Sequence, residues 1–184
     1  AGLVRAGKVR EIGCSNFTAE LLRTADTTSR ARGIARFVSV QNEYSMLHRE
    51  PEQEVLDECQ RLGIAFLPYF PLANGLLTGK YRLGKPVPEK SRLSSGARAT
   101  LTLNDRNLKT VERLIGFAEE HGHTLLELAI SWLLAHTPVA SVIAGATRAS
   151  QARGNAASAE WKLSAEELAA VNQLLSGAEA PPTA

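Results

Sequence analysis

PVASVIAGATRASQARGN, residues 138–155, has the order of a strand, a tight turn and a helix. Residues 139–143 are mostly β-branched, residues 144–146 are small, and a polar segment with helical character follows them. The N-terminus of a helix carries unpaired N–H groups and a positive dipole end, and small residues before it let an anion approach the backbone. The stretch therefore predicts either a phosphate-binding turn or a plain reversal of the chain.

The same order of strand and helix recurs along the rest of the sequence. Strands are predicted at residues 9–14, 37–41 and 64–69. Helices are predicted at residues 18–32, 51–63, 105–121, 125–135 and 165–175. Strands that alternate with helices favour a parallel sheet, and the almost wholly apolar segment 64–69 is typical of a strand buried on both faces.

Several residues mark where these helices begin. Thr18, Asn104 or Asp105, and Thr124 have the chemistry of N-caps, and Pro51 is predicted to open the third helix. Residues 70–104 form an irregular stretch that is longer than a strand-to-helix connection requires, and loops of this length are often functional.

Four strand-helix units make up half of an eight-stranded (β/α) barrel. Two folds fit: a small open α/β sheet, or one half of a TIM-type barrel with parallel strands. In both, the first and last strands have unpaired edges. We expect the barrel unit at residues 1–176 and a mobile Ala- and Pro-rich tail at 177–184. Because Ala1 has neither an initiator Met nor a helix cap, we expect the chain to begin inside an element.

Composition favours an ordinary globular domain. The 184 residues are 44% hydrophobic and 22% charged, and 21 basic and 19 acidic residues are spread along the chain. This spread argues against a nucleic-acid partner, which requires a concentrated basic face. No segment is apolar and long enough to cross a membrane and no signal peptide is evident, so we expect a cytoplasmic protein. Cys14 and Cys59 have no metal-binding spacing and are expected to be reduced thiols.

Four spaced motifs resemble the aldo-keto reductase family. They are GKVREIGCSNF at 7–17, QNEYS at 41–45, PYFPLANGLLTGKY at 68–81 and IAGATRASQARGN at 143–155. Their order and separation are similar to those of the family as far as Leu174. The resemblance implies the C-terminal half, strands five to eight, of a (β/α)8 barrel. It also implies a reductase that uses NADP(H) to convert aldehydes or ketones, its small carbonyl substrates, to alcohols.

The resemblance assigns residues to the nicotinamide end of the cofactor. It implies that Ser15, Asn16 and Gln41 hold the carboxamide and that Tyr69 stacks on the ring. It also places Pro71, Leu72 and Gly75 at the cofactor, with the backbone from Leu72 to Gly75 facing the pyrophosphate. From the residues alone, Asn16 also fits a turn, Gln41 a loop anchor and Tyr69 a core residue.

The resemblance assigns the opening stretch to the adenosine end. It implies that Gly145, Thr147 and Arg148 bind the 2′-phosphate and that Gln151 and Asn155 bind the adenine. The chain departs from the family pattern at three positions. Phe70 replaces a common Ser, Ala144 a frequent Pro, and Gly154 a common acidic residue, which removes one contact to adenine.

The family's catalytic Asp, Tyr, Lys and His lie on the first four strands, which this chain does not contain, so no catalytic residue or metal site is predicted. Tyr44 belongs to the QNEYS motif and His48 fits loop surface, so neither is given a catalytic role. We expect the isolated chain to be inactive. Two alternatives remain: a non-catalytic NADP-binding or regulatory module, and a half-barrel that requires a partner. That partner is the missing N-terminal half or a second copy joined through exposed strand edges.

Overall fold

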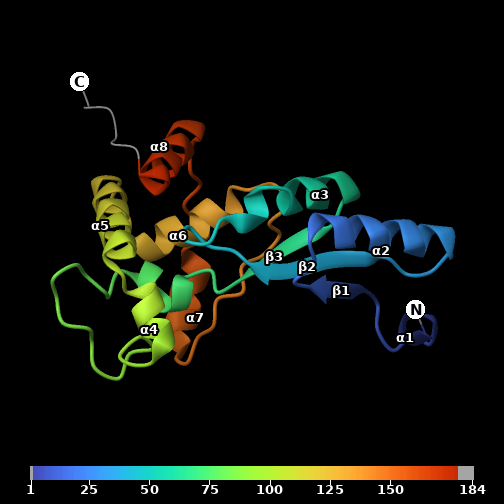
Figure 1. The fold of residues 1–184 in the computed structure, drawn as a ribbon, viewed down its shortest axis with the longest axis horizontal. Helices are drawn as coiled ribbons and strands as arrows, with labels where there is room; N and C mark the ends of the chain where they lie inside the picture. Colours follow the sequence, from blue (N-terminus) through green and yellow to red (C-terminus); the bar gives the residue numbers. More distant parts are fainter. Residues whose placement is uncertain (1, 178–184) are drawn as a thin grey trace.

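Three parallel strands form the sheet of the computed structural model, which describes residues 2–177 (Figure 1). They are β1 (Ile12–Ser15), β2 (Phe37–Glu43) and β3 (Ala65–Tyr69), and their order in the sheet is β1-β2-β3. Ser15 lies opposite Gln41, and Glu43 lies opposite Tyr69. The register therefore brings the carboxyl ends of all three strands to one edge of the sheet.

Helices fill most of the connections. They are α1 (Gly2–Arg5), α2 (Ala19–Ala31), α3 (Val55–Leu62), α4 (Ala97–Thr102), α5 (Asp105–Glu120), α6 (Leu125–Leu134), α7 (Ala149–Ala157) and α8 (Ala165–Ser176), with 3-10 turns η1 (Glu50–Glu52) and η2 (Ala73–Thr78). The predicted caps are confirmed, because Thr18, Asn104 and Thr124 each accept a backbone N–H bond in the first turn. Gly177 ends α8 in a left-handed conformation, and the rest of the predicted tail lies outside the described residues.

The two faces of the sheet have different surroundings. Val40 and Phe66 lie side by side on neighbouring strands and are fully buried. They belong to the same hydrophobic core as Leu56 and Cys59 of α3. In Figure 1, α2 and α3 lie together along one side of the strands. On β3 the alternate residues Ala65, Leu67 and Tyr69 point to the other face and are only half-buried. Strand alternation therefore gives the sheet one apolar face against the helices and one more open face.

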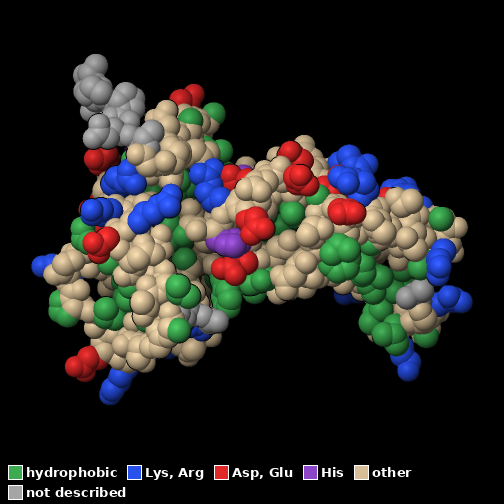
Figure 2. Space-filling view, in the orientation of Figure 1, with side chains coloured by type: hydrophobic (Ala, Val, Ile, Leu, Met, Phe, Trp, Pro, Cys, Tyr) green, Lys and Arg blue, Asp and Glu red, His purple; other side chains and the backbone are tan. Residues whose placement is uncertain are grey.

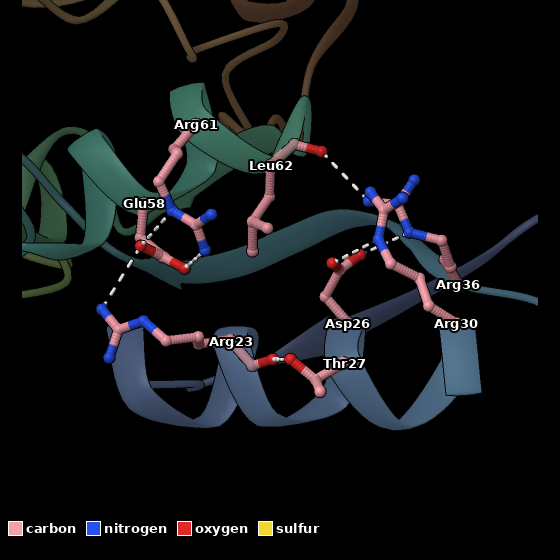
Figure 3. A network of polar contacts seen from close by, with 8 residues as sticks. All are labelled: Arg23, Asp26, Thr27, Arg30, Arg36, Glu58, Arg61 and Leu62. Atoms are coloured by element: carbon pink, nitrogen blue, oxygen red, sulfur yellow. Dashed lines mark hydrogen bonds and ion pairs between the residues drawn. The ribbon is translucent and has the colours of Figure 1, made fainter. Parts of the chain in front are cut away.

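Salt bridges join α2 to α3 (Figure 3). Glu58 on α3 binds Arg23 on α2 and Arg61 on its own helix. Asp26 on α2 binds Arg30 and Arg36, and Arg36 also donates to the Leu62 carbonyl at the end of α3. Both carboxylates are more than nine-tenths buried, so these bonds satisfy acceptors that water does not reach.

The predicted fourth strand at 139–143 is not a regular strand. The segment follows β3, with Phe66 N–H donating to Pro138 O at 2.7 Å and Ala140 N–H to Phe66 O at 3.1 Å. The next bond of a parallel ladder would come from the N–H of Pro68, which proline lacks. Pro68 O instead accepts from Ile143 N–H, at 3.0 Å, and only Val139 counts as bridged. A missing donor therefore ends the ladder.

Two further predictions require correction. Pro51 lies in the 3-10 turn η1 and does not open α3, which begins at Val55 after Glu54 adopts a non-helical backbone. The Glu52 side chain is held by Arg49 and by Tyr44, which anchors η1 to the core and keeps it separate from α3. The stretch 70–104 is less irregular than expected, because it contains η2 and α4.

A second layer of helices extends the core beyond the sheet. Val111 and Leu114 of α5, Trp132 of α6 and Val171 of α8 are fully buried together. The Trp132 indole donates to Asn172 of α8 at 3.1 Å, which satisfies its one polar atom. Among the described residues, no helix combines the length and hydropathy that spanning a bilayer requires.

Candidate functional site

Polar groups from the ends of all three strands meet at the carboxyl edge of the sheet. Ser15 Oγ and the Asn16 N–H both donate to the Gln41 carbonyl, at 2.8 and 3.0 Å. The Tyr69 hydroxyl donates to Asn16 Oδ1 at 2.8 Å, across 53 residues of sequence. The four residues predicted for the nicotinamide end therefore form one connected group.

Asn16 occupies a backbone conformation that few residues tolerate. Its φ is 57°, in the left-handed region, where Asn is among the commonest residues other than glycine. This turn leads the chain from β1 to the Thr18 cap of α2 and aims the Asn16 amide at Tyr69. The sequence Ser-Asn-Phe-Thr thus provides both the turn and the cap.

The Gln41 side chain is available to a ligand. It is half-buried on the open face of the sheet, in register with Ser15, and its amide forms no hydrogen bond within residues 2–177. A primary amide provides two donors and one acceptor at fixed positions. Gln41 therefore offers a ligand carboxamide matching donors and an acceptor, on the same face of the sheet as Tyr69.

A cleft of about 550 Å³ opens at the same edge of the sheet. Asn16 and Tyr69 line it together with residues that sequence analysis did not assign, among them Asn42, Glu43, His48, Glu50 and Glu54. The Asn42 amide donates to Phe17 O at 2.9 Å, whereas its buried Oδ1 has no partner among the described residues. Asn42 and Glu43 belong to the QNEYS motif, so the sequence pointed to their position. No motif pointed to His48 or Glu54.

Tyr44 is part of the scaffold beneath this cleft. Its ring is fully buried against Phe66 and Trp132, and its hydroxyl donates to Glu52 at 3.0 Å. Burial and the neighbouring Glu52 carboxylate raise the pKa of Tyr44 well above its usual range. A phenol that holds its proton so firmly suits a structural role, in agreement with its exclusion as a catalytic residue.

The loop after β3 has an unusual backbone. Phe70, Ala73, Asn74 and Gly75 all have positive φ, which costs energy at the three that are not glycine. Pro71 is buried, and the N–H groups of Ala73 and Gly75 donate to Phe70 O and Leu72 O within the loop. These two N–H groups are therefore already hydrogen-bonded within the loop. The buried Asn74 Oδ1, in contrast, has no hydrogen-bond partner among the described residues.

The predicted adenosine end is exposed and internally bonded. Gln151 Oε1 accepts from both the N–H and the hydroxyl of Thr147, at 2.9 and 3.0 Å, and Asn155 donates to Ala144 O at 3.5 Å. Arg148 precedes α7 and its exposed guanidinium forms no ion pair within residues 2–177. Gln151 thus ties Thr147 to the first turn of α7, and a phosphate has access to the Arg148 cation and this first turn.

The segment that leads to the predicted adenosine end runs beside β3, because Ile143 N–H donates to Pro68 O directly before Tyr69. A dinucleotide fits this chemistry: it presents a carboxamide to the free Gln41 amide and phosphates to Arg148 and the exposed N-terminus of α7. Among the described residues, no group of His, Cys, Asp or Glu side chains is arranged to hold a metal ion.

Comparison with known proteins gives one consistent result. The sequence profile of the "Aldo/keto reductase family" matches residues 1–176. "Probable aldo-keto reductase 1" of Glycine max is 34% identical over 90% of this chain and 46% of its own length. "L-glyceraldehyde 3-phosphate reductase" of Escherichia coli K12 is 32% identical over 97% of this chain and 53% of its own length. "Protein tas" of the same strain is 35% identical over 91% of this chain and 48% of its own length. The chain spans about half the length of these relatives.

Proposed function

Because the chain belongs to the aldo/keto reductase family, we propose that it is the NADP(H)-binding part of an oxidoreductase that reduces aldehydes or ketones to alcohols. The meeting of Ser15, Asn16, Gln41 and Tyr69 at one edge of a parallel sheet carries the proposal. Active sites of (β/α) barrels lie at this edge, and the three parallel strands are consistent with part of such a barrel.

The residues of this chain bind and orient the cofactor. Ser15, Asn16 and Gln41 hold the carboxamide, and the bond from Tyr69 to Asn16 fixes the aromatic ring beside it. When bound, the reduced nicotinamide supplies the hydride. We propose that the proton comes from a Tyr outside this chain, supported by the family's Asp, Lys and His, since the Tyr69 hydroxyl proton is already donated to Asn16.

We further propose that four more strands join the free edges of the sheet and close it into a barrel, in which β1, β2, β3 and the segment 139–143 would be strands five to eight. Within residues 2–177, β1 pairs with β2 only, so its other edge is free. Strand edges with free N–H and C=O groups are strong sites for pairing. The additional strands come from the remainder of the protein or from a second copy, and the isolated chain is then expected to show no turnover.

A cofactor titration tests this function. We expect NADP⁺ to bind the isolated chain saturably in isothermal calorimetry. Arg148→Gln should weaken NADP⁺ binding about tenfold, the order of one charge-assisted hydrogen bond, and leave NAD⁺ binding unchanged. Arg153→Gln is the matched control, because Arg153 is an exposed cation on the same helix and lies outside the predicted site.

Four outcomes would separate the alternatives. A chain that binds no NADP⁺ at millimolar concentration cannot be the cofactor-binding part. Binding without loss of NADPH absorbance in the presence of a reactive aldehyde agrees with the proposal, whereas rapid turnover by the isolated chain contradicts an external proton donor. A non-catalytic NADP-binding module predicts no turnover even after the remainder of the protein is supplied.

A further inference from the structure

A groove of about 550 Å³ lies where α5 meets α8, away from the cofactor residues. Its walls include Arg106, Lys109 and Arg113 of α5, Leu83 of the preceding loop and Leu175 of α8. Figure 2 shows lysine and arginine side chains gathered over this part of the molecule, in the upper left of the view. None of the predicted cofactor-binding residues lines the groove.

The three cations share one face of α5. Residues at positions i, i+3 and i+7 of a helix project in nearly the same direction, which describes 106, 109 and 113. None of the three forms an ion pair within residues 2–177. The carboxylate beside them, Glu112, is engaged by Arg82 at 2.7 Å and by the Leu83 N–H at 2.8 Å. The groove therefore carries unbalanced positive charge.

Arg113, which lines this groove, has an unsatisfied and buried donor. One terminal nitrogen donates to the Thr110 hydroxyl at 3.3 Å, while Nε is buried and has no partner among the described residues. A buried N–H without an acceptor costs about 1–3 kcal/mol. Because this Nε has almost no accessible surface, an anion in the groove would reach it only after the Arg113 side chain turns, and it would then provide that acceptor.

We propose that this groove binds a small organic anion with a carboxylate, sulfate or phosphate head and an apolar body. The head is placed by the cations of α5 and the Arg113 Nε–H. The apolar body is placed by Leu175 and by Leu83, whose side chain is 41% exposed. A volume of about 550 Å³ exceeds what an inorganic oxyanion alone fills, which favours an amphiphilic ligand.

The test compares octyl sulfate below its micellar concentration with inorganic sulfate and with uncharged octyl glucoside. We expect octyl sulfate alone to bind tightly and to shift the NMR signal of the Arg113 Nε–H. Arg106→Gln should weaken octyl sulfate binding about tenfold, as loss of one charged contact does. Arg32→Gln is the matched control, since Arg32 is an exposed cation at the end of α2 without a side-chain bond in the described chain.

Leu83→Asn provides a second variant, because Leu83 is partly exposed and its backbone bond to Glu112 does not depend on its side chain. It should weaken octyl sulfate binding and leave inorganic sulfate unaffected. The proposal is wrong if octyl glucoside or inorganic sulfate binds as tightly as octyl sulfate, or if Arg32→Gln is as harmful as Arg106→Gln. Because the cofactor residues lie elsewhere, these results do not depend on the NADP⁺ titration.

Discussion

Asn16 combines two tasks that the sequence alone does not separate. Its backbone turns the chain in the left-handed region, and its amide oxygen accepts the Tyr69 hydroxyl at 2.8 Å. Asn is suited to both because it tolerates positive φ and carries donors and acceptors. The side chain that binds Tyr69 at the strand edge thus belongs to a residue that the family resemblance assigns to the cofactor.

Replacing Asn16 by Ala and by Gly separates these two tasks. Asn16→Ala should lower the free energy of unfolding by about 1 kcal/mol, because alanine lacks the polar side chain that lets Asn tolerate this φ and that accepts the Tyr69 hydroxyl. Asn16→Gly should retain most of the stability, since glycine accepts positive φ readily. If the amide binds the carboxamide, both variants weaken NADP⁺ binding. Urea denaturation and calorimetry measure the two effects, and an Asn16→Gly chain with full NADP⁺ affinity would show that the amide only makes the turn.

Elements are held to one another by a few polar bonds added to apolar packing. The α2 and α3 helices cover the buried face of the sheet, and the carboxylates of Asp26 and Glu58 join them through arginines (Figure 3). Both carboxylates are nearly buried, whereas Arg30 and Arg61 remain more than half exposed. The contact therefore keeps part of its charge in water, which moderates the cost of desolvation.

Asp26→Asn tests the strength of this contact. The change keeps the size of the side chain and removes the charge that Arg30 and Arg36 surround. We expect a loss of about 2 kcal/mol in the free energy of unfolding, less than for a fully buried pair, because Arg30 is largely solvated. Asp57→Asn on the exposed side of α3 is the control and should change stability by less than about 0.5 kcal/mol. Equal effects of the two substitutions in urea denaturation would contradict a specific α2–α3 contact.

Several titratable groups across the molecule have pKa values shifted by burial or by ion pairs. The hydrogen bond from Arg61 lowers the pKa of Glu58, and that from Arg82 lowers the pKa of Glu112. Burial alone would raise the pKa of Asp26, but the bonds from Arg30 and Arg36 outweigh it and the pKa is lowered. Burial lowers the pKa of His136, which lies against Tyr44 and Trp132.

These shifts predict a stability that falls with acidity in two steps. His136 favours its neutral form when folded, so stability should begin to fall as the pH drops below the ordinary histidine value of about 6.5. The carboxylates have folded pKa values below their ordinary ones, so their contribution is complete above about pH 4.5 and is lost as the pH falls through the folded values. Thermal unfolding between pH 8 and pH 3 measures both steps.

A His136→Asn variant should lose the upper step and keep the lower one. A melting temperature that stays constant from pH 7 to pH 5 in the unchanged protein would show that His136 titrates normally when folded. If His136→Asn also lost the lower step, the titration of the carboxylates would depend on His136.

Much of the fold follows from local sequence. The strands at 37–41 and 64–69 and the caps at Thr18, Asn104 and Thr124 were predictable, because side-chain alternation and capping depend on neighbouring residues. The motifs also selected Ser15, Asn16, Gln41 and Tyr69, and the structure joins them at one edge. Their roles toward the cofactor stay predictions that the titration and the Asn16 variants test.

The features that sequence reasoning missed depend on which atoms meet across the fold. Composition predicts a strand at 139–143, but the pairing makes Pro68 its neighbour at the point where a donor is required, and the ladder ends. His48 and Glu54 line the cleft on either side of the η1 turn, whose Glu52 is bound by Tyr44 and Arg49 from outside the turn. Sequence by itself determined most of the elements and the family, since both are encoded in local patterns. Tertiary structure alone decided the ladder, the cleft and the basic groove, because each depends on contacts between residues distant in the chain.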